Sequence, residues 1–248
     1  MTMNGWRRVA AAAGFVLAAA CGGETAANGS AVGTLPDSVV TVPAVPTVTV
    51  TAVAPNSFSG TLPCADCSGM VTTVALFSDT TFRLREAYEG KRVAPVVSMG
   101  RWRHDGTTLT LDGVGRLQRF AVKGEDTLLL LDLGGQPIAG STLVTLERAD
   151  SMDALRDAAL YIGTFTFETD APSFRECGSG QTYQVLRRGA YKTVERAYTA
   201  AKLPPGSGQQ IEVTARFTAR PATMEGPKER DVIEFVRYVG PAANPDCR

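Results

Sequence analysis

The feature that most constrains the fold is a series of short alternating segments separated by tight turns between residues 58 and 148. Residues 81–85, for example, alternate apolar and basic side chains, which is the period of a half-buried β-strand. Trp102 lies between Arg101 and Arg103 in the same way and is expected to fill a core. The turn signals are Ser78-Asp79-Thr80, Asp105-Gly106, Asp112-Gly113 and residues 123–126. Successive hairpins without a helix predict an antiparallel meander, which avoids exposed edges by closing into a barrel.

The rest of the chain predicts a second β-rich unit with one helix. Residues 150–159 (DSMDALRDAA) predict a brief helix at the boundary, with Ser151 as its N-cap. Apolar side chains at helical spacing predict a longer helix over residues 191–202, which Pro204-Pro205-Gly206 ends. The predicted strands are residues 161–169, 182–186, 211–217 and 232–239. Strands, one helix and then strands predict a small five-stranded, OB-like barrel, so the whole chain is expected to be mainly antiparallel all-β.

The first residues are typical of an export signal. Arg7 and Arg8 precede an apolar run over residues 9–17, which is shorter than the roughly 20 residues of a membrane span. Small residues then lead into Cys21, the pattern of a lipobox in which the cysteine thiol is acylated. The sequence therefore predicts a signal peptide over residues 1–20 and a lipid anchor, palmitate included, on Cys21 that holds the protein to a membrane.

The segment that follows Cys21 predicts a tether. Residues 21–56 carry almost no charge and are rich in Ala, Val, Thr and Pro, a composition that favours extended, semi-flexible chain. An edge strand over residues 47–53 is the alternative, which the prolines around it disfavour. The predicted domains are then residues 57–149 and residues 160–248.

Charge and cysteine content narrow the functional classes. Lys plus Arg and Asp plus Glu both number 25, so the chain lacks the basic excess that nucleic-acid binders use to neutralise phosphates. There are 5 Cys, and a lipid on one of them leaves four, enough for two disulfides in an oxidising envelope. Four cysteines allow three pairings, and their spacing favours Cys64 with Cys67 and Cys177 with Cys247.

The segment LPCADCSG is the best candidate for chemistry. Two thiols at the spacing of Cys64 and Cys67 can close a small disulfide, bind a soft metal such as Cu(I), or exchange disulfides. Zn²⁺ wants four ligands, which this region does not supply, whereas Cu(I) accepts two or three sulfur donors, with Met70 as a conceivable third. The single histidine, His104, stands beside a turn, where we expect it to be solvated. With no G-x-S-x-G elbow in the sequence, we expect no enzyme.

Several motifs together resemble NlpE-type lipoproteins. FSGTLPCADCSGM, a strand, a Ser-Asp-Thr turn and TFRLREAYEG are similar to the N-terminal domain of that family, as are GRWRHDGTTLTLDG and RFAVKGEDTLLLLDLGGQPI. In the second half, FRECGSGQTYQV, YKTVERAY, TARPATMEGP and the final Cys247 follow the family's C-terminal region in order. The resemblance covers most of the chain after the tether, and the tether itself departs from the family pattern.

The resemblance implies a small lipocalin-like barrel followed by an OB-type barrel. It implies an outer-membrane lipoprotein that faces the periplasm and acts in copper resistance and in the sensing of envelope stress or surface contact. By this resemblance, Cys64 and Cys67 match the family's CxxC. Cys177 and Cys247 match the cysteines that form a disulfide in its C-terminal domain. A sensor kinase of the envelope, or another periplasmic protein, is the implied partner, and copper is the implied metal.

The residues also allow a rival hypothesis. Barrels of this size can hold one small ligand, so the chain can instead be a ligand-binding or enzyme-inhibitor module whose cysteines only staple the fold. An unfilled apolar interior would favour that rival. A filled interior beside an accessible CxxC would favour a sensor.

Overall fold

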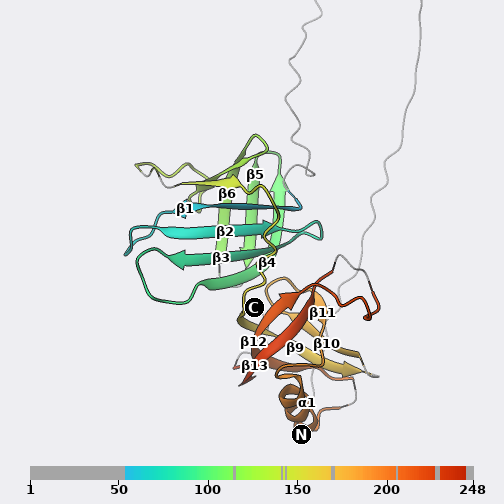
Figure 1. Ribbon diagram of the computed structural model, residues 1–248. Coiled ribbons are helices and arrows are strands. Elements are labelled where there is room, and N and C mark those ends of the chain that lie inside the picture. The colour runs from blue at the N-terminus through green and yellow to red at the C-terminus, as the bar shows by residue number, and fades with distance from the viewer. Residues whose placement is uncertain are drawn as a thin grey trace, which may run out of the picture. The chain divides into compact units, whose positions relative to one another are not determined.

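Eight consecutive strands close into the predicted barrel (Figure 1). In this computed structural model the described residues are 54–113, 116–140, 142, 144–168, 171–204, 206–226 and 230–243. The barrel strands are β1 (Asn56–Leu62), β2 (Met70–Leu76), β3 (Thr81–Tyr88), β4 (Val96–Asp105), β5 (Thr108–Gly113), β6 (Arg116–Lys123), β7 (Thr127–Leu131) and β8 (Thr145–Arg148). Each strand is antiparallel to the next, and β1 pairs with β8 to complete the ring, for example at Phe58 and Arg148. The ring leaves no open edge.

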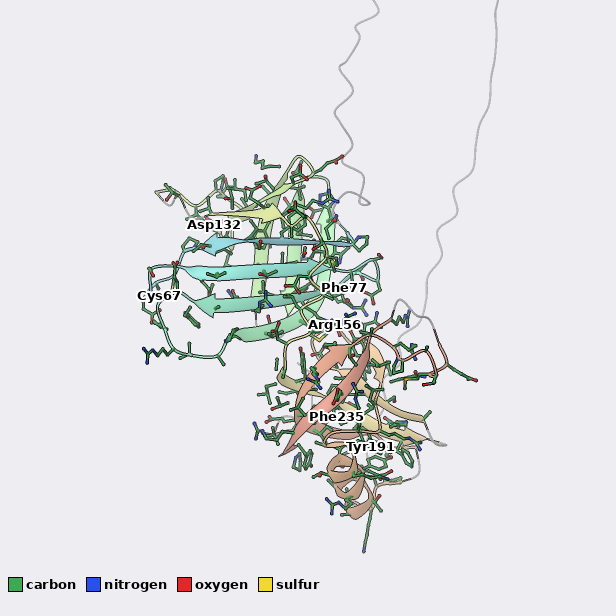
Figure 2. The ribbon with its side chains drawn as sticks, in the orientation of Figure 1. Cys67, Phe77, Asp132, Arg156, Tyr191 and Phe235 are labelled. Carbon is green, nitrogen blue, oxygen red and sulfur yellow. A yellow bond between two sulfur atoms is a disulfide. The ribbon has the colours of Figure 1, made fainter. Side chains whose placement is uncertain are left out.

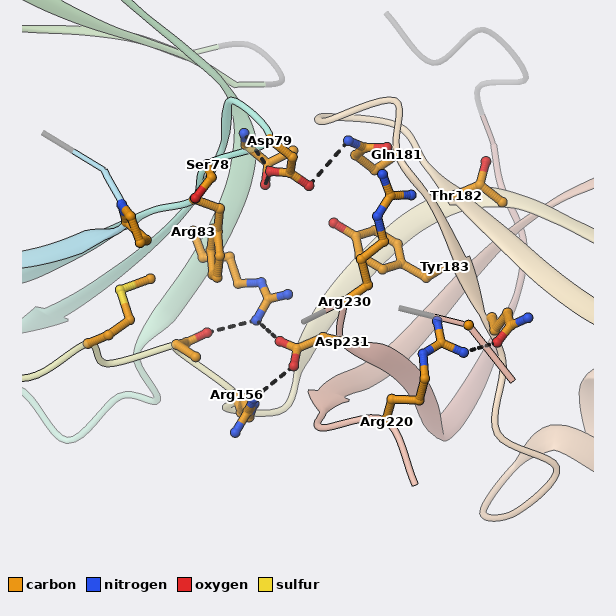
Figure 3. A pocket seen from close by; sticks show the side chains of 17 residues that line it. Ser78, Asp79, Arg83, Arg156, Gln181, Thr182, Tyr183, Arg220, Arg230 and Asp231 are labelled. Carbon is orange, nitrogen blue, oxygen red and sulfur yellow. Dashed lines mark hydrogen bonds and ion pairs between the residues drawn. The ribbon is translucent and has the colours of Figure 1, made fainter. Parts of the chain in front are cut away.

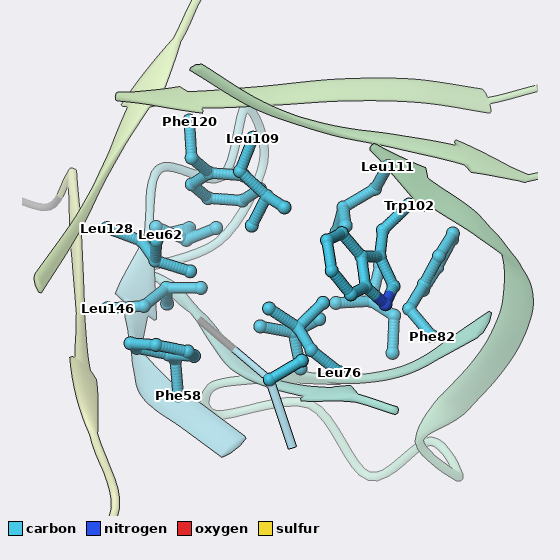
Figure 4. Close-up of a cluster of buried hydrophobic side chains, with 13 residues drawn as sticks. Phe58, Leu62, Leu76, Phe82, Trp102, Leu109, Leu111, Phe120, Leu128 and Leu146 are labelled. Atoms are coloured by element: carbon cyan, nitrogen blue, oxygen red, sulfur yellow. The ribbon is translucent and has the colours of Figure 1, made fainter. Parts of the chain in front are cut away.

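The barrel interior is filled by apolar side chains, as the alternation in the sequence requires. Trp102 is 6% exposed, and Phe58 and Phe120 are almost completely buried (Figure 4). The indole Nε1 of Trp102 donates a hydrogen bond to the carbonyl oxygen of Phe77, at 2.9 Å, so this large side chain also satisfies its polar group. The interior cluster comprises Ala54, Phe58, Leu62, Val74, Leu76, Phe82, Leu84, Trp102, Leu109, Leu111, Phe120, Leu128 and Leu146.

The second unit is a five-stranded antiparallel sheet in the order β11-β10-β9-β12-β13. Its strands are β9 (Ala159–Glu168), β10 (Ala171–Glu176), β11 (Thr182–Gln184), β12 (Gln209–Thr218) and β13 (Val232–Pro241). The helix α1 (Tyr191–Ala200) follows β11 and buries Tyr191 and Val194 in the same core. Edge-to-face aromatic pairs, such as Phe174 with Phe235, build that core. The fold class predicted from the sequence is therefore confirmed.

The predicted helix over residues 150–159 is wrong, because this segment has no regular structure up to the start of β9 at Ala159. The hydroxyl of Ser57 donates to the carbonyl of Ser151 and accepts from the amide of Asp153. The carbonyl of Ala154 accepts from Arg83, and Leu155 has a positive φ of 45°. Backbone groups that a helix would pair internally are thus bonded to the barrel instead.

Other boundaries differ from the prediction in smaller ways. Asp112 and Gly113 belong to β5, paired with β4, rather than to a turn. β10 was not predicted at all, and β11 is shorter than the predicted strand over residues 182–186 because Val185 makes only an isolated bridge to Ile233. The signal peptide, Cys21, residues 21–53 of the predicted tether with the alternative strand over residues 47–53, and Cys247 lie outside the described residues. Of the last tether residues, Ala54 is buried in the interior cluster of the barrel and Asn56 begins β1. Among the described residues, no helix has the length and apolar character to cross a membrane.

An arginine on the outside of the barrel joins the barrel to the sheet. The two domains belong to the same compact part of the chain. Arg83 of β3 is 4% exposed, and its Nη1 lies 2.7 Å from the carbonyl oxygen of Ala154 and 2.8 Å from Oδ2 of Asp231. Its guanidinium carbon lies 3.7 Å from the ring centre of Phe217. Arg156 pairs with the other oxygen of Asp231, at 2.8 Å. A charge that is buried in this way requires such partners.

Candidate functional site

The two cysteines of the CxxC lie at one end of the barrel, on the loop between β1 and β2, and a disulfide joins them. Their Cα atoms are 5.3 Å apart, and both residues are half-buried, whereas Ala65 and Asp66 between them are exposed. Cys67 precedes β2 and Phe77 follows it, so the CxxC loop and the β2–β3 turn occupy opposite ends of the barrel (Figure 2). The pair is therefore outside the apolar interior.

An ion pair connects the CxxC loop to the next loop at the same end. Nζ of Lys91 lies 2.6 Å from Oδ2 of Asp66. The hydrogen bond that Lys91 donates, and then its charge, lower the pKa of the Asp66 carboxyl below its ordinary value. The amide of Glu89 also donates to the carbonyl of Gly69, at 3.0 Å. The residues around the disulfide are thus held by exposed polar contacts rather than by core packing.

The loop also gathers three groups that can ligate a metal ion. The sulfur atoms of Cys64 and Cys67 and a carboxylate oxygen of Asp66 all lie within 4.8 Å of one another, and they form the one such group found among the described residues. In the disulfide state the sulfurs are not thiolates, so reduction must precede binding of a soft metal. By strand alternation Met70 shares the interior face of β2 with Val74, a position not directed toward the loop surface. Asp66 was missed as a ligand because sequence spacing alone gave it no signal.

Buried polar groups lie inside the barrel toward the same end. Glu86 faces the interior, two positions beyond Leu84, and is 3% exposed. Arg116 of β6 pairs with its Oε2, although two strands separate β3 from β6 along the ring, so the pair crosses the interior. Oε1 of Glu86 and Oε1 of Gln118 are buried without hydrogen-bond partners. The sequence did not indicate this pair, since the contact depends on closure of the barrel.

The cysteine of the second domain, Cys177, has a different setting. Cys177 is disulfide-bonded, and its amide donates to the carbonyl of Ile162 at 2.9 Å. The predicted partner, Cys247, is outside the described residues, so that pairing stays a prediction. The carboxylate of Glu176 accepts from the amides of Gly178 and Ser179, at 2.8 and 2.7 Å. Burial raises the pKa of Glu176 in spite of these bonds.

His104 is not the solvated turn residue that the sequence predicted. It belongs to β4, is half-buried, and its Nε2 is buried without a hydrogen-bond partner. By alternation with Trp102 it faces the barrel interior at the end opposite the CxxC loop. Its position gives it no role at the candidate site.

Comparisons with known proteins agree with this architecture. The family model described as the NlpE N-terminal domain matches residues 58–141, and that described as the NlpE C-terminal OB domain matches residues 156–248. Lipoprotein NlpE of Escherichia coli K12 is 34% identical over 167 residues, which are 66% of this chain and 69% of that protein.

Two solved structures are also similar. The Cpx pathway activator NlpE from Escherichia coli is 29% identical, with 78% of this chain and 98% of that chain covered and a TM-score of 0.33. A putative lipoprotein from Shewanella oneidensis is 33% identical, with 41% and 94% covered and a TM-score of 0.36. Because both domain models match in order and the curated relative is similar over most of its length, the chain belongs to the NlpE family of lipoproteins.

Proposed function

We propose that this chain is a non-enzymatic lipoprotein of the cell envelope that reports copper or envelope stress through Cys64 and Cys67. Lipid on Cys21 anchors it to the outer membrane, facing the periplasm, and a signalling protein of the envelope reads its state. The observation that carries the proposal is the position of the disulfide on an exposed loop, outside the barrel core.

Kinship supports the signalling part of the proposal. A solved relative is described as the activator of the Cpx pathway, and the present chain shares 29% identity with it over 98% of its length. The lipobox at Cys21 and the cysteine content favour the same compartment, since disulfides persist in the oxidising envelope.

The geometry of the loop supports a responsive site. Cys64 and Cys67 neighbour Asp66 and Lys91, which are polar and solvent-accessible, and the apolar cluster of the barrel lies apart from them. A dithiol reductant would convert the disulfide into two thiols beside a carboxylate oxygen, and these thiols lose their protons when they bind a metal. The two sulfurs of this donor set suit Cu(I). Opening the disulfide or capturing a metal changes the loop and its Asp66–Lys91 contact, and therefore the surface presented to a partner.

The filled interior favours this function over a ligand-binding barrel. The interior cluster includes four large aromatic side chains, of Phe58, Phe82, Trp102 and Phe120. A close-packed interior leaves little room for an apolar ligand. A small ligand inside the barrel would therefore have to displace these side chains, which disfavours the hypothesis of a ligand-binding barrel.

The test is a titration of Cu(I), under reducing conditions, into the full chain purified in detergent. We expect tight binding of one Cu(I), lost in Cys64→Ser/Cys67→Ser and weakened in Asp66→Asn. Lys91→Gln, which breaks the ion pair but removes no ligand, is the matched control and should still bind. In cells, copper tolerance and an envelope-stress reporter are measured for the same variants. Unchanged tolerance and unchanged signalling in Cys64→Ser/Cys67→Ser would reject the proposal.

A further inference from the structure

At the barrel end opposite the CxxC loop there is a pocket of about 700 Å³ that the proposed function does not use (Figure 3). The described residues that line it come mainly from the β2–β3 turn, from the segment before β9, from β11, and from Arg220, Gly226, Arg230 and Asp231 between β12 and β13. This volume lies within the usual range of ligand sites, about 300–1,000 Å³.

One wall of the pocket is an unpaired strand edge. β11 ends the sheet, so only β10 pairs with it along Thr182–Gln184. The amide of Val185 donates to the carbonyl of Pro172, and the amide of Glu176 donates to the carbonyl of Gln181. Because hydrogen bonding alternates along an antiparallel pair, Thr182 directs its N–H and C=O away from β10, toward the free edge. The outer edge is taken up by β13 from the end of β11 onward, where Val185 bridges Ile233 and the amide of Leu186 donates to the carbonyl of Ile233, so Thr182 is the position of β11 left open.

The pocket also has a positive excess in a chain whose net charge is zero. Four arginines and two aspartates line it. Asp231 already pairs with Arg83 and Arg156, and Asp79 accepts from Gln181 at 3.3 Å. Arg230 is exposed, and the structure shows no ion-pair partner for it among the described residues. Among the described residues, Arg230 therefore offers an anionic group in the pocket a positive charge that no carboxylate pairs.

We infer that this pocket docks an extended acidic segment of a partner protein, whose backbone pairs with the outward groups of Thr182 on β11. The backbone of the segment supplies the donors and acceptors that Thr182 lacks, and its carboxylates face Arg230. Peptide recognition by strand addition works in this way, with affinity from main-chain bonds and selectivity from side chains. A simple anion would use the arginine but not the strand edge, so the two features together favour a peptide. The inference stands whether or not the CxxC pair senses copper.

The probe is a fluorescein-labelled peptide of alternating Glu and Thr, added to the full chain in zwitterionic detergent and followed by anisotropy. We expect saturable binding that Arg230→Glu weakens by about tenfold or more, because it replaces attraction with repulsion. Arg196→Glu changes the net charge equally, but on the exposed surface of α1, and should leave the dissociation constant within about twofold. A matching peptide of Lys and Thr should not bind.

Strand pairing is tested separately from charge. The same acidic peptide, N-methylated at alternate residues, keeps its carboxylates but cannot pair along an edge, and we expect it not to bind. Thr182→Pro removes the outward N–H and should weaken the unmodified peptide, with thermal unfolding used to verify that the variant folds. Equal binding by Arg230→Glu would overturn the inference. Equal binding of the N-methylated peptide would also overturn the inference, because charge attraction without strand pairing would then explain the binding.

Discussion

The two domains each contain a disulfide-bonded cysteine, but they set it in very different surroundings. In the barrel, Cys64 and Cys67 occupy a loop beyond the ends of β1 and β2, beside the exposed pair of Asp66 and Lys91. In the sheet, Cys177 directly follows β10 and is bonded through its amide to Ile162 on β9. The difference teaches that one disulfide can lie in a loop held by exposed polar contacts, while the cysteine of the other directly continues a strand of the sheet. We therefore expect the pair of Cys64 and Cys67 to change state with less disturbance of its domain than the disulfide of Cys177.

The largest expected effect is a difference between the two disulfides in how much each contributes to the free energy of unfolding. Removing the pair predicted in the sheet, with Cys177→Ser/Cys247→Ser, should lower the free energy of unfolding by about 4 kcal/mol in the chain-entropy model, since the loop closed is long. The disulfide between Cys64 and Cys67 closes a much shorter loop, so Cys64→Ser/Cys67→Ser should lower the free energy of unfolding by at most about 2 kcal/mol. Urea unfolding, followed by Trp102 fluorescence and by circular dichroism, measures both. An equal or larger loss for the barrel pair would break the comparison.

The next effect tests whether barrel and sheet are one cooperative unit. Arg83→Met leaves Asp231 buried with only Arg156 as its charged partner, and we expect a loss of about 3 kcal/mol. Arg85→Met, two residues along the same strand, removes only partly exposed ion pairs to Asp153 and Asp157 and should cost about 1 kcal/mol or less. Thermal unfolding compares the two variants. A cost for Arg83→Met no greater than that for Arg85→Met would show that the junction contributes little.

A smaller effect, confined to the sheet, depends on pH. Burial alone would raise the pKa of Glu234, but hydrogen bonds from Arg216 and Arg188 outweigh it and lower that pKa below the ordinary value of 4.5. A lowered folded-state pKa stabilises the protein above the unfolded value, and this stabilisation is lost as the pH falls through the folded value. Glu234→Gln should therefore cost about 1 kcal/mol at pH 7, since both arginines are half exposed.

That cost should shrink below about pH 4.5, as the wild-type carboxyl becomes protonated. Urea unfolding at a series of pH values measures the gap between the wild type and the variant. Glu212→Gln, on the neighbouring strand β12, is the control, because the structure shows no ion pair for Glu212 among the described residues. A gap that grows on acidification would contradict the sign of the pKa shift.

Local signals account for what could be predicted of the fold. The β2–β3 turn and the turn at Asp105-Gly106 lie where the sequence placed them, because turn residues and strand alternation act over a few positions. The helix expected over residues 150–159 failed because Ser57 and Arg83, far away in sequence, take its backbone groups. β10 escaped notice because Pro172 weakens its strand signal.

At the candidate site, too, local features could be predicted from the sequence, whereas contacts between distant residues could not. The CxxC was visible from spacing, since two cysteines three residues apart need no tertiary information. The contact of Glu86 with Arg116 depends on the curvature of the barrel, and that of Asp66 with Lys91 depends on the pairing of β2 with β3. The pocket beside β11 likewise depends on five stretches of the chain that are far apart in the sequence, so no local pattern predicted it.

The most direct test of the central claim is graded reduction of the native full chain, with alkylation of each cysteine read by mass spectrometry. Near-ultraviolet circular dichroism of Trp102 monitors the barrel core in the same samples. We predict that Cys64 and Cys67 are alkylated first, before Cys177, while the Trp102 signal stays native. Alkylation of Cys64 and Cys67 only together with Cys177, or only after the Trp102 signal is lost, would contradict a peripheral, responsive CxxC.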